Sequence, residues 1–82
     1  MVDKIGIEEI VEQYVRSYLS YHAGRKIPSK LYDKVIFDAE RAVIKVALEK
    51  NNLNQLKTAS MLGINRNTLH AKMKKLKIKG MK

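Results

Sequence analysis

The chain has 82 residues, of which 17 are Lys or Arg and 8 are Asp or Glu, so its net charge at pH 7 is +9. It contains no Cys, which excludes a disulfide framework and a Cys-based zinc site. No apolar run approaches the roughly 20 residues of a membrane span, and the N-terminus lacks the apolar core of a signal peptide. We therefore expect one cytoplasmic domain over residues 1–82, small enough that oligomerisation would help to stabilise it.

The positive charge is concentrated in one half of the chain. Residues 1–49 contain 8 basic and 8 acidic residues, whereas residues 50–82 contain 9 basic residues and no acidic one. This asymmetry predicts a polyanionic partner, and double-stranded DNA is the partner that we expect. The alternatives are a basic tail that aids solubility and a tail that binds an anionic membrane; the uneven division of charge argues against both.

An i, i+3, i+4 apolar pattern predicts a first helix from Ile7 to about His22. Gly24 and Pro28 indicate a loop after this helix, and Ser29 is the expected N-cap of the next one. The apolar row of the first helix consists of Ile7, Ile10, Val11, Tyr14, Val15, Tyr18 and Leu19. Such a row is more often part of a core or a dimer interface than of a ligand site.

The second predicted helix, from about Lys30 to Lys50, is apolar on most of its faces. Its polar positions form one narrow stripe, and so short a chain cannot cover the remaining faces by itself. A second copy of the chain is the natural cover, which predicts an interlocked two-fold dimer held by residues 7–50. The expected interface residues are Ile10, Tyr14, Tyr18, Val35, Ile36, Ala39 and Val43.

Residues 54–79 predict a helix-turn-helix, which is two short helices joined by a sharp turn. Asn54 is suited to cap the first of these helices and Asn65 the second. Gly63 lies where the end of a helix requires a positive φ. Leu69, Met73 and Leu76 recur at i, i+4 and i+7, so we expect them to form the buried row of the last helix.

The other side of the last helix has the chemistry of DNA recognition. With Leu69 and Met73 turned inward, the outer side and its flanks carry polar and basic residues: Arg66, Asn67, Thr68, His70, Lys74 and Lys75. Arg pairs with guanine, Asn pairs with adenine, and Thr contacts phosphate. The alternative interpretation is a solvated basic helix on an ordinary helical bundle.

The segment LGINRNTLHAKMKKLKI resembles the C-terminal half of the Fis family (factor for inversion stimulation), and the similarity in spacing and apolar pattern covers nearly the whole chain. The resemblance implies an all-α fold of four helices, an intertwined homodimer, and a nucleoid-associated regulator that binds and bends DNA. It implies DNA contacts at Asn54, Gln55, Asn65, Arg66, Thr68, Lys72 and Lys75. His70 and Ala71 depart from the family, in which well-studied members have two basic residues at these positions.

The same motif also ends the enhancer-binding activators of the NtrC type, so the C-terminal dimerisation and DNA-binding domain of such an activator is the alternative. We expect a free-standing protein, because the chain begins with Met and the similarity to Fis is nearly complete. RNA polymerase or a recombinase would be further partners.

A second class of function is a helical module that binds another protein through its apolar first helix. Such a module would not require a second half that lacks acidic residues. We expect no enzyme, cofactor or metal site, because neither His22 nor His70 has a suitably spaced partner.

Overall fold

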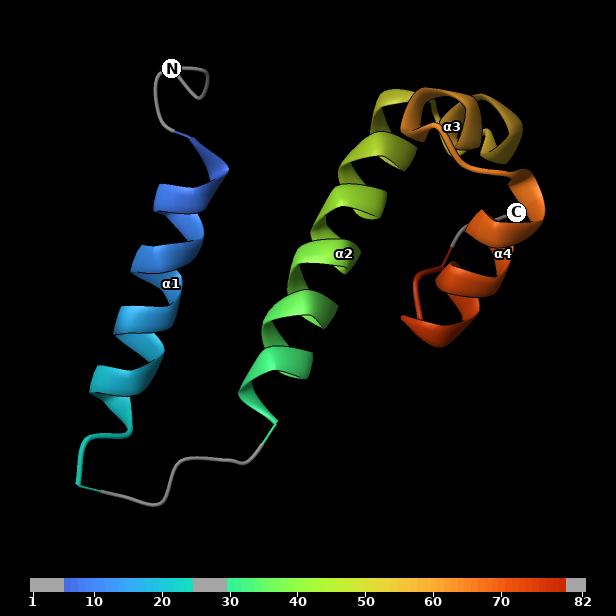
Figure 1. Ribbon diagram of the computed structural model, residues 1–82. Helices are drawn as coiled ribbons and strands as arrows, with labels where there is room; N and C mark the ends of the chain where they lie inside the picture. Colours follow the sequence, from blue (N-terminus) through green and yellow to red (C-terminus); the bar gives the residue numbers. More distant parts are fainter. Residues whose placement is uncertain (1–5, 25–29, 80–82) are drawn as a thin grey trace. The chain divides into compact units, whose positions relative to one another are not determined.

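The computed structural model describes residues 6–24 and 30–79, which form four helices and no strand (Figure 1). The helices are α1 (Ile7–Tyr21), α2 (Leu31–Lys50), α3 (Gln55–Leu62) and α4 (Arg66–Lys75). The prediction of an all-α chain with four helices is confirmed. Within the described ranges, no helix has both the length and the apolar character that a membrane crossing requires.

The chain divides into two compact units, an N-terminal unit (Met1–Leu31) and a C-terminal unit (Tyr32–Lys82). The N-terminal unit contains α1, and the C-terminal unit contains nearly all of α2 together with α3 and α4. The predicted dimerisation segment, residues 7–50, spans α1 and α2 and stays a prediction. The single domain over residues 1–82 stays a prediction.

Helix α1 begins and ends close to the predicted residues. The backbone N–H of Gly6 donates to Glu9 Oε1 at 3.3 Å, and Glu8 and Glu9 lie in the first turn, where acidic side chains suit the helix dipole. His22 follows the last turn, with its Nδ1 atom 3.0 Å from the carbonyl oxygen of Tyr18. No residue of α1 is fully buried. The predicted loop breaker Pro28 and cap Ser29 lie outside the described residues.

The core of the C-terminal unit joins all three of its helices. The second half of α2 contributes Ile44 and Leu48, which are each 2% exposed. They pack with four buried residues from α3, α4 and the end of α4: Ala59, Leu69, Met73 and Leu76. Leu69, Met73 and Leu76 therefore form the buried row that the sequence predicted. Leu62, Ile64 and Ile78 are partly buried against the same cluster.

The predicted caps and turn of the helix-turn-helix are confirmed. The side chain of Asn54 accepts a hydrogen bond from the backbone N–H of Lys57 at 2.9 Å, which satisfies one donor at the start of α3. The side chain of Asn65 accepts from the backbone N–H of Asn67 at 2.7 Å at the start of α4. Between the two helices, Gly63 has a φ of 77°. A positive φ strains a residue that has a Cβ, so glycine suits this position.

Helices α2 and α4 end in the same way as α3 but without glycine. After α4, the N–H of Ile78 donates to the carbonyl of Met73 at 2.9 Å and the N–H of Lys77 to that of Lys74 at 3.2 Å. This is the Schellman pattern, which requires a left-handed residue directly after the helix. Lys77 occupies that position with a φ of 58°, and Asn52 occupies the equivalent position after α2 with a φ of 54°. A long side chain at such a φ is strained.

Lys77→Gly is expected to stabilise the folded chain. The left-handed conformation costs a residue with a Cβ roughly 1–2 kcal/mol, and the greater flexibility of unfolded glycine offsets about 0.5–1 kcal/mol of that gain. We expect a net increase of up to about 1 kcal/mol in the free energy of unfolding. Urea unfolding, followed by circular dichroism at one fixed protein concentration, measures it.

The matched control is Lys79→Gly, which removes the same charge from a nearby residue that has no positive φ. Lys79→Gly should not stabilise the chain. Equal unfolding midpoints for the two variants would show that Lys77 is not under backbone strain.

Candidate nucleic-acid interface

Helix α4 presents a polar first turn to solvent. Arg66, Asn67 and Thr68 are all exposed, while Leu69, which directly follows them, is fully buried at 0% exposure. This buried side chain fixes the rotation of the helix about its axis, so the side opposite to Leu69 faces outward. The backbone N–H groups of a first helical turn have no partner within the helix. Of these, the Asn67 N–H is already taken by the Asn65 side chain.

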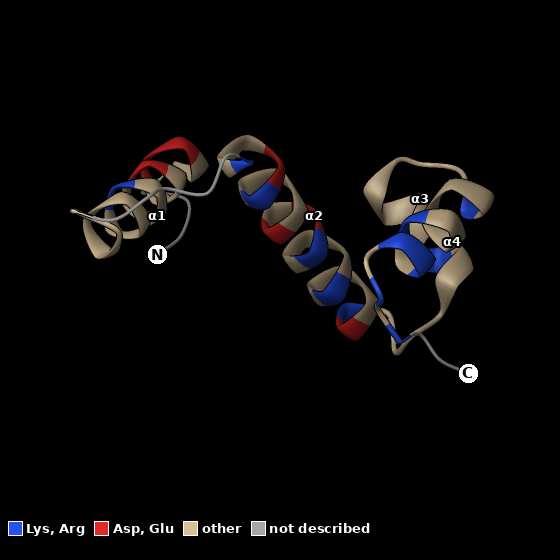
Figure 2. Ribbon diagram, turned by 90° about the horizontal axis from the view of Figure 1, so that it is seen from below, with Lys and Arg blue, Asp and Glu red and all other residues tan. Residues whose placement is uncertain are grey.

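The exposed side continues along α4 with two cations. Lys74 and Lys75 are exposed, and so are His70 and Ala71 between them and the first turn. Figure 2 shows Lys and Arg on α3, α4 and the segment after α4, with no acidic residue there, whereas α1 and α2 carry both signs. The surface around α4 is therefore positively charged, which suits a polyanion.

The N-terminus of α3 contributes the remaining predicted residues, Asn54 and Gln55. The side-chain oxygen of Asn54 serves as the helix cap, and its backbone oxygen accepts from the Thr58 hydroxyl at 2.7 Å. Thr58 is fully buried at 0% exposure, so this hydrogen bond satisfies its hydroxyl group inside the core. Gln55 is half-buried. Asn54 and Asn65 both use their carbonyl oxygens as caps, which leaves their amide groups as the atoms available to a ligand.

Lys72 differs from the other cations of α4. Its ammonium group forms an ion pair with the Glu40 carboxylate of α2, with 2.5 Å between Nζ and Oε2. The two side chains are 39% and 32% exposed, and the two residues lie 32 positions apart in the sequence. Within residues 6–24 and 30–79, no other basic side chain of α4 forms an ion pair. Lys72, a predicted DNA contact, is thus already held by a carboxylate.

A second contact from α2 reaches the far end of α4. Arg41 donates from its Nε atom to the carbonyl oxygen of Leu76 at 3.1 Å. The last carbonyl groups of a helix have no partner within it and carry the negative end of its dipole, so a guanidinium group stabilises this end. Neighbouring residues of α2, Glu40 and Arg41, thus both bind the second half of α4.

Most of the predicted DNA-contacting residues lie on α4 or at its start, and the structure brings them together. Arg66, Asn67, Thr68, His70, Lys74 and Lys75 are exposed along α4, Asn65 precedes it, and Lys72 is half-buried. Sequence reasoning missed the roles of Glu40 and Arg41, because a period of 3.6 residues shows which side of one helix is polar but not which residue of another helix it meets. Among the described residues, no group of three or more His, Asp or Glu is placed to hold a metal ion.

The family model and the similar proteins indicate the same family. A family model described as "Bacterial regulatory protein, Fis family" matches residues 36–76. "DNA-binding protein Fis" of Glaesserella parasuis is 39% identical over 69 residues, which cover 84% of this chain and 69% of the relative. The protein of the same name from Pasteurella multocida is 36% identical over the same shares.

"DNA-binding transcriptional regulator NtrC" of Azospirillum brasilense is also similar, with 37% identity over 73 residues. These residues cover 89% of this chain but only 15% of the relative, so the chain spans a small part of the NtrC proteins that it matches. No solved structure matches the chain. From the family model and the similarity to Fis over most of both proteins, the chain belongs to the Fis family of bacterial regulatory proteins.

Proposed function

We propose that this chain is a Fis-type transcription regulator that binds and bends double-stranded DNA as a homodimer on the nucleoid. The observation that carries the proposal is the exposed side of α4, which has Arg66, Asn67 and Thr68 in its first turn and Lys74 and Lys75 at its far end. The names of the relatives support it, since both the Fis and the NtrC proteins are described as DNA-binding.

The first turn of α4 is suited to the major groove. The guanidinium group of Arg66 has a planar fork that matches the two acceptors of guanine in that groove, and the amide of Asn67 can pair with adenine. Thr68 and the free N–H groups of the turn can bind the adjacent phosphates. Lys74 and Lys75, two turns further along, supply point charges for the backbone rather than base recognition.

The dimer is supported by apolar side chains of α2 that the core of the C-terminal unit leaves exposed. On α2, Ile36 is 46% and Val43 is 49% exposed, although both are large apolar residues in the predicted interface. Val35 and Ala39, on the same helix, are half-buried. A dimer that covers this side of α2 would remove the apolar area from water, at about 25 cal/mol for each Å².

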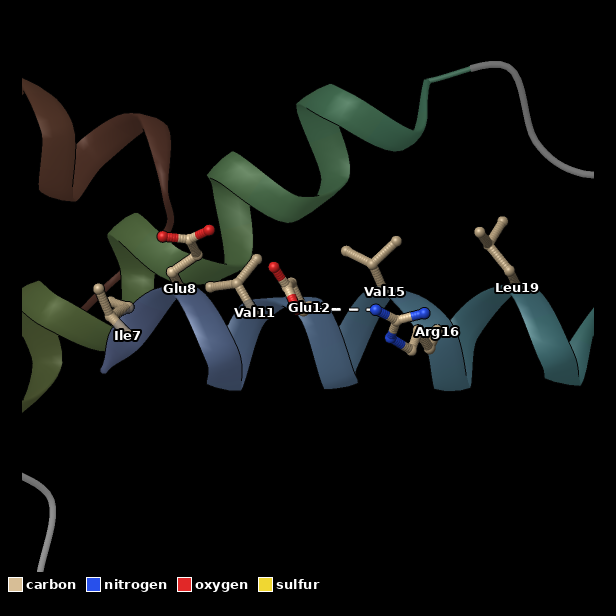
Figure 3. A pocket seen from close by; sticks show the side chains of 7 residues that line it. All are labelled: Ile7, Glu8, Val11, Glu12, Val15, Arg16 and Leu19. Carbon is tan, nitrogen blue, oxygen red and sulfur yellow. Dashed lines mark ion pairs between the residues drawn. The ribbon is translucent and has the colours of Figure 1, made fainter. Parts of the chain in front are cut away.

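Helix α1 has a comparable apolar surface. Ile10 is 48% and Tyr14 39% exposed, and Tyr18 is half-buried. A neighbouring row of Ile7, Val11, Val15 and Leu19 projects from one side of the helix and lines an open hollow with the Glu12–Arg16 ion pair (Figure 3). The amphipathic character of α1 supports a role in association rather than an isolated surface helix.

DNA bending is proposed from the resemblance to Fis together with the dimer. In Fis, the two recognition helices lie closer together than one turn of straight DNA, which is about 34 Å. If this spacing holds here, the duplex must curve to place both copies of α4 in successive major grooves. Part of the sequence preference would then come from the ease with which the DNA bends.

The NtrC relatives support a second candidate, the DNA-binding domain of an NtrC-type activator. The chain matches these proteins at 37–39% identity through nearly its whole length. An antibody against this chain distinguishes the candidates in cells of the source organism. A band near 9.4 kDa supports the Fis-type protein, and a band several times larger supports the activator domain. A separate part of the proposal concerns protein partners: contacts with RNA polymerase or a recombinase, which the resemblance to Fis supports.

Arg66→Ala is expected to reduce sequence recognition, whereas Lys75→Ala should weaken all DNA binding equally. Loss of the Arg66 fork should cost about 1–3 kcal/mol per half-site on a site selected from random duplexes, and much less on random DNA. Removal of the Lys75 charge should flatten the slope of log K against log salt by about 1 for each phosphate that this lysine neutralises. Mobility-shift titrations with both DNAs at two salt concentrations measure the effects. Equal weakening on both DNAs by Arg66→Ala would rule out base recognition by this residue.

Val43→Asp is expected to dissociate the dimer without unfolding the chain. Because Val43 is 49% exposed in one chain, the single chain tolerates the carboxylate, whereas in a dimer interface it would be buried without a partner at a cost of several kcal/mol, roughly 3–5. Sedimentation at micromolar concentration measures the mass. Ser60→Asp places the same charge on an exposed site of α3 and should leave the dimer intact. A wild-type chain that sediments as a folded monomer would disprove the dimer.

The complex with DNA is expected to be bent. In a circular-permutation assay, its mobility should depend on the position of the binding site within a set of equally long fragments. Sites with flexible pyrimidine–purine steps should bind more tightly than stiff A-tract sites of the same flanking sequence. Mobility that is independent of site position would show that the spacing of the recognition helices differs from that in Fis.

A further inference from the structure

The ion pair between Glu40 and Lys72 places a carboxylate beside the proposed DNA-binding helix. Residues 50–82 contain no acidic side chain, so the negative charge next to α4 comes from a different helix, α2. The pair is half-buried on both sides, with exposures of 39% and 32%. A pair in this environment is less screened than one on an open surface.

The pair changes what Lys72 offers to DNA. A free lysine that contacts a phosphate releases a condensed counterion, and this release drives non-specific binding. The charge of Lys72 is already neutralised by Glu40, so a phosphate can take the ammonium group only by breaking the pair. Lys74 and Lys75 have no ion-pair partner among the described residues and face no such competition.

Removing the charge of Glu40 should leave α4 in place. Leu69 and Met73 anchor the helix in the core, with 0% and 4% exposure, and Arg41 holds its far end through the Leu76 carbonyl. These contacts do not involve the Glu40 carboxylate. The Glu40 charge therefore affects the electrostatics of α4 more than its position.

We propose that Glu40 is a brake on DNA affinity, because its carboxylate holds Lys72 and competes with the phosphates of the duplex for that ammonium group. This inference rests on the proposed DNA binding of α4. It predicts that Lys72 contributes less to the wild-type DNA affinity than Lys74 or Lys75 does. It also predicts that a change at Glu40 alters this affinity.

Glu40→Gln tests the brake, since it keeps the shape of the side chain and an oxygen that can accept from Lys72. One additional phosphate contact has a salt slope of about −0.9, which corresponds to about 5- to 10-fold tighter binding at 0.1 M salt for each subunit that makes it. The salt slope should become steeper by about 1 per subunit. Random-sequence duplex is the probe, measured by fluorescence anisotropy at several salt concentrations.

Lys72→Ala completes the cycle. In the Glu40→Gln background it should remove the gain, by the additivity argument of a double-mutant cycle. In the wild-type background Lys72→Ala also frees the Glu40 carboxylate beside α4, so only the Glu40→Gln background isolates the effect of the ammonium group. The matched control is Asp38→Asn, which removes a carboxylate from the same helix; Asp38 pairs with Lys34 of α2 itself at 2.9 Å. Asp38→Asn should leave the affinity nearly unchanged.

The outcomes separate the brake from the proposed function. If the wild type does not bind duplex at low salt, the proposed function fails. If the wild type binds but Glu40→Gln binds no more tightly, or binds more weakly with an unchanged circular dichroism spectrum, the brake is disproved and Glu40 only positions α4. Tighter binding by Glu40→Gln that persists unchanged when Lys72→Ala is added would also disprove it, because the gain would then come from the lost negative charge and not from the freed Lys72 ammonium group.

Discussion

The C-terminal unit depends on a core that three helices share. Helix α3 has 8 residues and α4 has 10, and helices this short are marginal in water without tertiary contacts. Leu69 and Met73 of α4 pack on Ile44 and Leu48 of α2, with Ala59 of α3 in the same cluster. This contact makes α4 stable, and because it buries one defined side of the helix, it also decides which side faces outward.

The caps and turns add to the stability that the core gives to the short helices of the C-terminal unit. Short helices have a large share of unsatisfied backbone groups, and in this unit Asn54 and Asn65 satisfy donors at the helix starts. Left-handed residues close the helix ends, with Gly63 after α3 and Lys77 after α4. The exposed side of α4 therefore starts at a well-defined residue, and the first turn has a defined orientation relative to the core.

Each of the two units has apolar side chains that its own packing does not bury. The core uses only the second half of α2, while Ile36 and Val43 stay about half exposed. Helix α1 has no fully buried residue. Burial between two copies is the cover that we propose for such surface in so small a domain. The proposed dimer and the proposed DNA recognition thus use different parts of the chain, and the shared helix α2 connects them.

Much of this protein was predictable from the sequence alone. Apolar periodicity predicted the four helices and the buried row of Leu69, Met73 and Leu76, because the α-helical repeat directly relates sequence position to side. The chemistry of Asn54, Gly63 and Asn65 predicted the caps and the turn, since those are local backbone requirements. The exposed candidates of α4 followed from the same periodicity, and the acid-free second half indicated the class of partner.

The tertiary structure decided the contacts between helices. Glu40 and Lys72 are 32 residues apart, and Arg41 and Leu76 are 35 apart; no period or local motif relates such positions. The pairing depends on how α2 and α4 meet in the shared core, which contains Ile44, Leu48 and Leu69. The sequence could not predict the positive φ of Lys77 either, because lysine has no preference for that conformation. The packing of Ile78 against the core requires it. Helix periodicity, caps and turns depend on residues close together in the sequence, so the sequence alone predicts them. The partner that a side chain meets on another helix depends on how the helices pack in the core.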